Sequence, residues 1–204
     1  THFYFGEDLP VSAMAAGADI AAVSMHKSGG SLTQSSLLLT NKNVRWEYVA
    51  QIINLTQTTS ASYLLMSSLD ISRRNLALRG EESFGKVMKM AEYARNEINE
   101  IGGYYAYGRE LNNGSSVFDY DVTKLSVYTR DIGLAGIEVY DLLRDEYDIQ
   151  IEFGDIGNIL AYISIGDRIQ DIERLVGALA DIKRLYSKDN AKMLSMEYIP
   201  PIVS

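Results

Sequence analysis

Two adjacent glycines, Gly102 and Gly103, divide this chain into parts with different hydrophobic patterns. From about residue 43 to 101, apolar residues recur at helical spacing over long stretches. After the pair, short strand-like runs alternate with helical ones. Because glycine ends helices by adopting backbone conformations that other residues avoid, the pair predicts a helix end and a domain boundary near residue 103. We therefore expect two domains, residues 1–103 and residues 104–204.

The first part begins with two short apolar runs, residues 20–25 and 36–40, which predict buried strands. Between them, residues 27–31 have the composition of a turn, with two glycines and two serines. Helical patterns follow at residues 44–49, 60–77 and 87–94. This order of strands and helices favours α/β layering in the first part.

The second part has a β-α-β-β-α order, which predicts a smaller α+β unit. The last helix has apolar residues at steps of three and four, with Asp167 in the N-cap position and Gln170 behind it. The tyrosine-rich residues 103–108 favour an amphipathic strand or an interface over a ligand-stacking surface. Strands are expected at residues 124–129, 149–153 and 159–165, and helices at residues 133–147 and 168–185.

Composition narrows the classes of function. The 204 residues carry a net charge of −8, which repels polyanions, so we expect no nucleic-acid partner. Cysteine is absent, which excludes disulfides, thiolate catalysis and cysteine-ligated metals. No apolar run approaches the roughly 20 residues that span a bilayer, so we expect a cytoplasmic protein without membrane contact. Asp119 and Asp121 lack a third ligand at suitable spacing, so we expect loop residues and no metal site.

Lys27 is the residue with the clearest chemical potential. It follows a strongly apolar run and opens a segment rich in serine and glycine. Partial desolvation there would favour the neutral, nucleophilic amine, which can form a Schiff base with an aldehyde cofactor. The hydroxyl and backbone N–H groups around it can bind a phosphate. On residue chemistry alone, a solvated loop lysine and a plain Gly29-Gly30 turn are the commoner interpretations.

Residues 24–36 read Ser-Met-His-Lys-Ser-Gly-Gly-Ser-Leu-Thr-Gln-Ser-Ser. This segment closely resembles the Ser-x-His-Lys segment of the bacterial ornithine/lysine/arginine decarboxylases, which are fold-type I enzymes that use pyridoxal phosphate (PLP). Its continuation is similar to that of the arginine-decarboxylase-like branch, with Ser28 where that branch has threonine. The resemblance covers essentially the whole chain and includes residues 3–5, 9–13, 17–20, 58–70 and 133–136.

The resemblance implies an α/β fold of the PLP-dependent aminotransferase-like class, with part of the large domain followed by a small α+β domain. It makes Lys27 the Schiff-base lysine and places Ser24 and His26 around the cofactor phosphate and that lysine. His26 or Lys27 would return a proton to the substrate. Thr59 would approach a phosphate across a dimer interface, and His2 would lie beside the cofactor.

The family also has an Asp-x-Ala-His-Gly segment, whose aspartate pairs with the cofactor's ring nitrogen. We expect that segment just before Thr1, so we interpret the chain as an internal fragment with little or no turnover by itself. The parent would be a homodimeric or higher even-numbered PLP-dependent decarboxylase in polyamine biosynthesis, with arginine favoured over lysine or ornithine. Two alternatives stay open: an aminotransferase or aldolase of the same fold, and an inactive scaffold subunit.

Overall fold

A computed structural model describes residues 5, 6 and 8–188 of the chain. The chain forms two compact units. The first unit comprises Thr1–Tyr93, Gly108–Lys124 and Ile163–Asp171, and the second comprises Ala94–Tyr107, Leu125–Tyr162 and Ile172–Ser204. The expected domain boundary near residue 103 stays a prediction.

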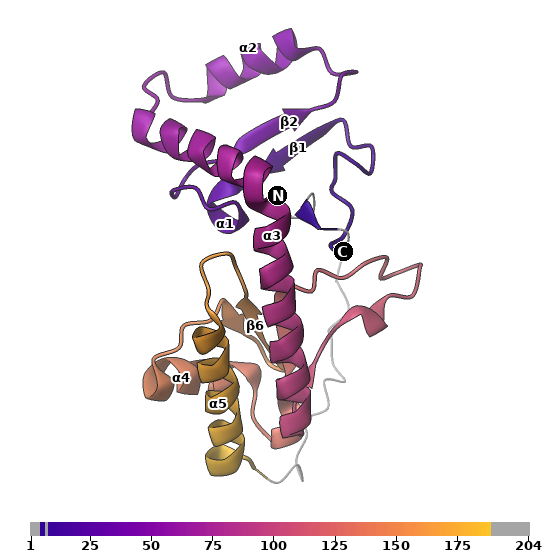
Figure 1. The fold of residues 1–204 in the computed structure, drawn as a ribbon, viewed down its shortest axis with the longest axis vertical. Coiled ribbons are helices and arrows are strands. Elements are labelled where there is room, and N and C mark those ends of the chain that lie inside the picture. Colours follow the sequence, from indigo (N-terminus) through magenta and orange to yellow (C-terminus); the bar gives the residue numbers. More distant parts are fainter. Residues whose placement is uncertain (1–4, 7, 189–204) are drawn as a thin grey trace, which may run out of the picture. The chain divides into compact units, whose positions relative to one another are not determined.

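The first unit is built on an antiparallel hairpin of β1 (Ile20–Val23) and β2 (Leu37–Thr40), which lie side by side in Figure 1. Both strands were predicted, but the prediction that they are buried is wrong: Ile20 is 49% exposed and Leu38 is 39% exposed. A two-stranded ribbon has two faces, and the described residues do not bury either face. The hairpin loop contains α1 (Met25–Ser28), a single helical turn.

Two longer helices follow the hairpin, α2 (Trp46–Thr56) and α3 (Tyr63–Ile101). The separate helix expected over residues 60–77 is wrong, because α3 runs without a break through Gly80. That glycine is needed for contact rather than for a turn: a Cβ there would collide with the ring of Phe5, which itself stacks on Phe84. The core of this unit gathers around α3, with Leu9, Leu76, Phe84, Val87 and Ala91 buried.

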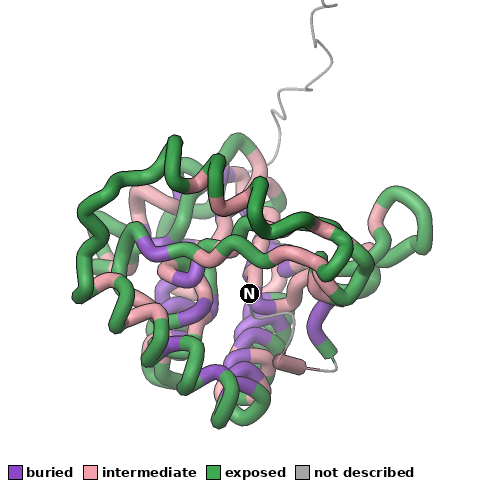
Figure 2. The backbone as a smooth tube through the Cα atoms, turned by 90° about the horizontal axis from the view of Figure 1, so that it is seen from above, coloured by how far each residue is buried: buried purple, intermediate pink, exposed green. Residues whose placement is uncertain are grey.

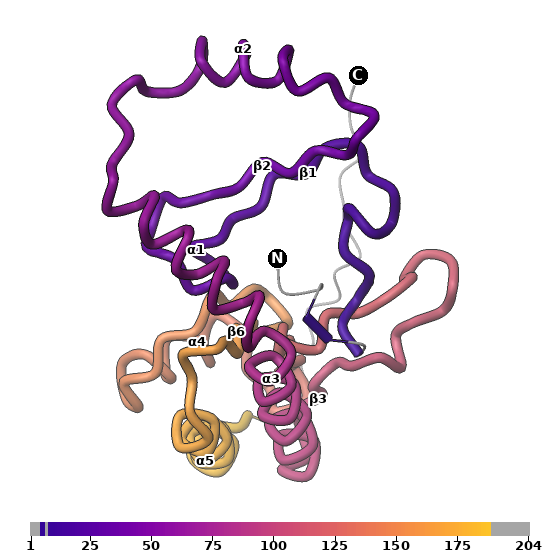
Figure 3. The backbone as a smooth tube through the Cα atoms, turned by 45° about the horizontal axis from the view of Figure 1, so that its top comes forward, coloured from indigo at the N-terminus to yellow at the C-terminus, as the bar shows by residue number. Residues whose placement is uncertain are grey.

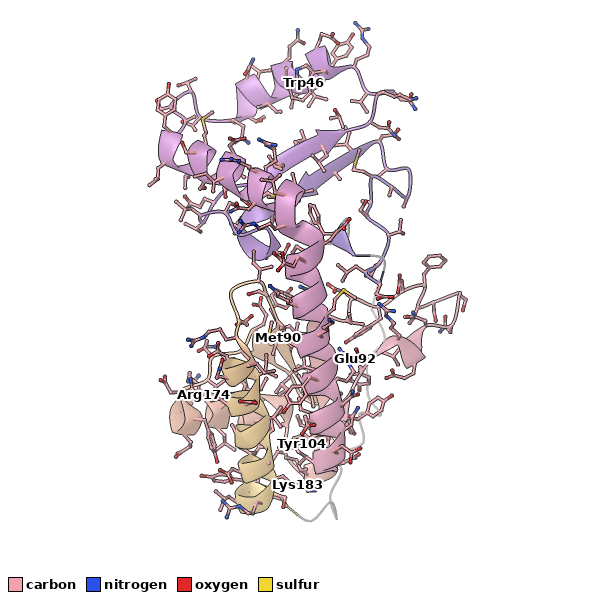
Figure 4. All side chains as sticks on the ribbon, viewed as in Figure 1. Trp46, Met90, Glu92, Tyr104, Arg174 and Lys183 are labelled. Atoms are coloured by element: carbon pink, nitrogen blue, oxygen red, sulfur yellow. The ribbon has the colours of Figure 1, made fainter. Side chains whose placement is uncertain are left out.

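Helix α3 ends at Ile101, as Gly102-Gly103 predicted. Both glycines have positive φ values, 70° and 73°, which turn the chain out of the helix. Lys183 Nζ caps this end by donating to the Ile101 carbonyl at 2.5 Å. Figure 4 labels Lys183 near this helix end.

The second unit has a four-stranded sheet in the order β3-β4-β6-β5. The tyrosine-rich segment supplies the short β3 (Tyr105–Ala106), which pairs antiparallel with β4 (Lys124–Tyr128). The other strands are β5 (Phe153–Gly154) and β6 (Asn158–Tyr162), also antiparallel. The strand expected over residues 149–153 is therefore almost entirely wrong. Asp148 turns the chain at φ 53° and Ile149 N–H bonds to Leu143 O, so these residues close the preceding helix instead.

Helices α4 (Gly136–Tyr147) and α5 (Ile169–Tyr186) complete the second unit close to their predicted positions. Their apolar stripes are buried, and purple marks buried positions in Figure 2. Asp167 is not the predicted cap of α5: it accepts hydrogen bonds from Ser164 instead. Asp171, three residues after Arg168, accepts the Arg168 backbone N–H at 3.0 Å and supplies the reciprocal half of a capping box.

Gly136 lets the start of α4 approach the β5–β6 turn. A Cβ on Gly136 would collide with the carbonyl oxygen of Asn158, and Ile137 N–H donates to Asp155 O at 2.8 Å. Gly136 thus has a steric role within the Gly-Leu-Ala-Gly segment of residues 133–136. Among the described residues, no helix is both long enough and apolar enough to span a membrane.

Candidate active site

The predicted site residues Ser24, His26 and Lys27 lie together at the single turn of α1. Figure 3 shows α1 at one end of the hairpin, in the loop that joins β1 to β2. Ser24 is the N-cap residue, but its side chain makes no capping hydrogen bond, and the residue is exposed. His26 is half-buried and Lys27 is exposed. The turn therefore presents an amine and a hydroxyl to solvent, with an imidazole beside them.

The expectation that Lys27 is partly desolvated is wrong for the described part of the chain. Met25 packs inward with only 2% of its surface exposed. Since Lys27 is two residues further along a helical turn, its side chain leaves from nearly the opposite side. None of the described residues covers the lysine enough to take it out of water.

Gly29 and Gly30 form the predicted turn after Lys27. Gly29 N–H donates to Met25 O at 2.8 Å, and a Cβ on Gly29 would lie 2.7 Å from the terminal methyl of Met25. Gly30 has φ 85°, the left-handed region that favours glycine. Both glycines are explained by the turn itself.

Two serines on α3 hold this loop. Buried Ser72 donates its hydroxyl to Gly29 O, and the Leu32 N–H donates to Ser68 Oγ at 3.3 Å. Ser68 and Ser72 are one helical turn apart, so they bind the two ends of the segment from Gly29 to Leu32. The loop is thus fixed to the longest helix of the chain.

The sequence interpretation missed the role of these serines, although a signal was present. Ser72 lies on the inward-facing stripe of α3 that also carries Leu65, Leu69 and Leu76. A serine on such a stripe predicts a buried hydroxyl that needs a partner. The pattern of α3 could not predict that this partner is the carbonyl of Gly29, because Gly29 lies 43 positions away in the chain.

Two further site residues were predicted, Thr59 and His2. Thr59 is exposed and lies in the loop between α2 and α3. His2 lies outside the described residues. Asp119 and Asp121 accept hydrogen bonds within their own loop, from Tyr120 N–H and from Thr123, as expected of loop residues. The described residues contain no group of three or more potential metal ligands.

A shallow hollow of about 360 Å³ occurs on the second unit, next to α4. Carboxylates dominate its lining, and most of them are already paired: Asp141 and Asp145 with Arg144, and Glu138 with Lys188 at 2.6 Å. Three of its four carboxylates thus have a basic partner within the unit, and two of these share Arg144. The hollow therefore does not compete with the α1 turn as a candidate site.

Comparison with known proteins identifies the family. Residues 1–123 match the family model described as Orn/Lys/Arg decarboxylase, major domain. The chain belongs to the Orn/Lys/Arg decarboxylase family. This confirms the resemblance noted from residues 24–36.

Two curated relatives in this decarboxylase family are both named arginine decarboxylase. The one from Halalkalibacterium halodurans is 43% identical over 186 residues, which are 91% of this chain and 38% of the relative. The one from Bacillus subtilis is 40% identical over 201 residues, which are 98% of this chain and 41% of the relative. The chain thus spans about two-fifths of the length of these relatives.

Solved structures share the fold at low sequence identity. The lysine decarboxylase of Francisella novicida matches with a TM-score of 0.78 and 17% identity, over 91% of this chain and 31% of that one. An aromatic aminotransferase from Pyrococcus horikoshii matches with a TM-score of 0.57 and 14% identity, over 90% of this chain and 48% of that one. These matches confirm the expected mixed α/β fold of this class, while the arrangement of a small α+β domain stays a prediction.

Proposed function

We propose that this chain supplies the cofactor-bearing lysine of a PLP-dependent decarboxylase that acts on a basic amino acid. Arginine is the favoured substrate, because the relatives of 40–43% identity are named arginine decarboxylase; lysine and ornithine are the alternatives. The product would be an amine that serves polyamine biosynthesis. The observation that carries the proposal is the exposed amine of Lys27 on a turn shared with Ser24 and His26, in a family of decarboxylases.

The side chains around Lys27 fit a cofactor that has an aldehyde and a phosphate. Lys27 offers a primary amine at the surface of the turn, and Ser24 and Thr33 are exposed and carry hydroxyl groups. Hydroxyl and N–H donors are the groups that bind phosphate oxygens. By family resemblance, Lys27 would hold the cofactor covalently, Ser24 and His26 would surround its phosphate and the lysine, and Thr59 and His2 would complete the site.

When bound, PLP supplies an electron sink for the electron pair left on Cα after carbon dioxide departs. The chain's own residues would hold the cofactor and transfer protons. Lys27 Nζ would hold the cofactor at its aldehyde and would give up that position to the amine of the substrate. Lys27 or His26 would supply the proton that Cα requires.

We also propose that the enzyme works as a homodimer or a higher even-numbered assembly. Thr59, which would reach the partner's site, follows α2, and α2 has no buried residue. Trp46, Ile52 and Leu55 on that helix are 53%, 60% and 82% exposed, and Figure 4 labels Trp46 on α2. Apolar side chains exposed on one helix favour burial against another surface.

Borohydride reduction tests the role of Lys27 directly. The protein that carries this chain is incubated with PLP, reduced and digested, and its peptides are mapped. We expect the pyridoxyl group on Lys27, its loss in Lys27→Ala, and its retention in Lys42→Ala, which removes another lysine of the same unit. A label on Lys42, or no label at all, would contradict the proposal.

Product analysis separates decarboxylation from the alternatives. With arginine, lysine or ornithine labelled at the carboxyl carbon, a decarboxylase releases labelled carbon dioxide, and we expect the fastest release from arginine. The chain also shares its fold with an aromatic aminotransferase. An aminotransferase would leave the labelled carboxylate in its product. A scaffold subunit would neither take up PLP nor release label.

A further inference from the structure

One backbone carbonyl, that of Ser35, receives two hydrogen bonds from His26. The His26 backbone N–H donates to Ser35 O at 3.3 Å, and Nδ1 of the His26 ring lies 2.9 Å from the same oxygen. A carbonyl oxygen can only accept hydrogen bonds. The proton of the neutral His26 ring must therefore be on Nδ1, which leaves the lone pair on Nε2.

The Ser35 side chain holds that carbonyl in place. Ser35 is only 2% exposed, and its hydroxyl donates to Leu32 O. A serine hydroxyl has one proton, so the 2.6 Å contact between Ser31 Oγ and Ser35 Oγ must be donated by Ser31. The hydroxyl and the carbonyl of Ser35 thus form hydrogen bonds to other residues of the loop. These bonds fix the backbone of Ser35 close to β2.

Ser35 and His26 lie at the loop end of the hairpin, just beyond its last paired residues. The last paired residues of the ladder are Val23 and Leu37, and the His26 contacts to Ser35 continue the closure of the loop beyond them. The His26 ring is half-buried as a result, whereas Lys27 next to it is exposed. The ring orientation is thus set by the hairpin and does not depend on any ligand.

We propose that Ser35 is a positioning residue that keeps His26 in the Nδ1–H form, so that Nε2 is the nitrogen that exchanges a proton with a ligand held at Lys27. The identity of that ligand rests on the proposed function, but the ring state does not. As a neutral ring, His26 accepts a proton at Nε2, and as a cation it donates from the same atom. Ser35 acts through this choice of nitrogen and contacts no reacting group itself.

The ¹⁵N chemical shifts of the His26 ring test the proposal without cofactor or substrate. They are recorded on the protein at a pH well above the ordinary histidine pKa of about 6.5. A His26→Gln variant identifies the His26 signals by their loss. We expect Nδ1 in the protonated range and Nε2 in the unprotonated range. The opposite assignment in the wild-type protein would overturn the proposal.

Variants at Ser35 test whether that residue is responsible. Ser35→Ala should shift His26 toward the Nε2–H form that free histidine prefers, and Ser35→Thr, which keeps the hydroxyl, should restore the Nδ1–H form. Ser36→Ala, an exposed neighbour, is the matched control and should leave the shifts unchanged. Unchanged shifts in Ser35→Ala would show that Ser35 does not set the ring state.

The two proposals fail separately. Nδ1–H at His26 without borohydride labelling of Lys27 would support the role of Ser35 and refute the proposed function. Labelling of Lys27 with Nε2–H at His26 would do the reverse. If Ser35→Ala does not fold, the wild-type shifts alone still decide which nitrogen carries the proton.

Discussion

Helix α2 of the first unit and helix α5 of the second have similarly amphipathic sequences but opposite degrees of burial. Helix α5 buries Ile172, Leu175, Ala178, Leu179 and Ile182, whereas α2 buries none of its residues. A hydrophobic stripe determines which face of a helix is apolar, but burial requires a second layer against that face. The second unit supplies that layer from its own residues, and the described residues of the first unit do not supply one for α2.

Alanine substitutions in α5 and α2 should differ most in their effect on the free energy of unfolding. Leu179 is fully buried, so Leu179→Ala should lower the free energy of unfolding by about 2–5 kcal/mol through lost contacts and a cavity. Leu55 is 82% exposed, so Leu55→Ala should change it by no more than about 0.5 kcal/mol. Denaturant unfolding monitored by circular dichroism measures both. A large loss in Leu55→Ala would mean that α2 is covered in solution.

A pair of glycines tests how tightly the second unit is packed. Gly136→Ala forces a methyl group into the Asn158 carbonyl and should destabilise by about 1–3 kcal/mol. Gly177→Ala places its methyl in open space on α5 and should stabilise by about 0.5–1 kcal/mol, because alanine favours helix. Thermal unfolding of the two variants should therefore move in opposite directions. The same direction for both would contradict the close approach of α4 to the strands.

The buried hydroxyl of Ser72 is one of the groups that hold the loop around Lys27. Ser72→Ala leaves the Gly29 carbonyl without this partner and should cost about 1–3 kcal/mol, expressed mainly in the loop. Amide hydrogen exchange should show faster exchange at Gly29 and Leu32, whose N–H groups are hydrogen-bonded in the same loop. Ser67→Ala, at an exposed position on the same helix, is the control. Equal exchange in the two variants would show that Ser72 does not hold the loop.

The smallest expected effect concerns acid stability in the second unit. The hydrogen bond from Lys188, followed by the Ala135 N–H, lowers the pKa of Glu138 below its ordinary value of 4.5. A carboxylate with a lowered folded-state pKa stabilises the fold above its unfolded pKa, and this contribution disappears as the pH falls through the folded-state pKa. Because the pair is substantially exposed, we expect only about 0.2–1 kcal/mol.

Glu138→Gln should remove that dependence. The loss of stability between pH 7 and pH 3 should be smaller in this variant than in the wild type, as measured by urea unfolding at each pH. Glu173→Gln, at an exposed position on α5, serves as the control. An identical pH profile for Glu138→Gln and the wild type would show that the ion pair adds nothing.

Periodic patterns predicted the elements that bury one face. The helices at 133–147 and 168–185 and the strand at 124–129 were found to within a few residues, because their apolar spacing matches their own geometry. Residues 149–153 were misassigned, because an apolar run does not reveal that Asp148 takes a left-handed conformation. The helical pattern was assigned to two separate stretches, 60–77 and 87–94, where the structure has the single helix α3. Gly80 and Gly85 lie between those stretches, and Gly80 is needed for contact with Phe5.

The candidate site was predictable in its residue types but not in its surroundings. Ser24, His26 and Lys27 are close enough in the chain for local sequence to place them together on one turn. The contacts that support the turn come from Ser35, Ser68 and Ser72, which lie further along the chain and are ordinary in type. The exposure of Lys27 was missed because an apolar run indicates burial of its own residues and carries no information about the next side chain.

The inward Met25 also constrains chain length. Each residue of a helix advances the direction of its side chain by about 100°, so inserting or deleting one residue between Val23 and Met25 would rotate the whole turn by that angle. The Met25 side chain would then leave its buried position. The amine of Lys27 would point along the surface instead of away from it. Insertions and deletions at this junction should therefore be less tolerated than substitutions at exposed Ser24. Such a substitution changes one side chain but leaves the directions of the others around the turn as they are.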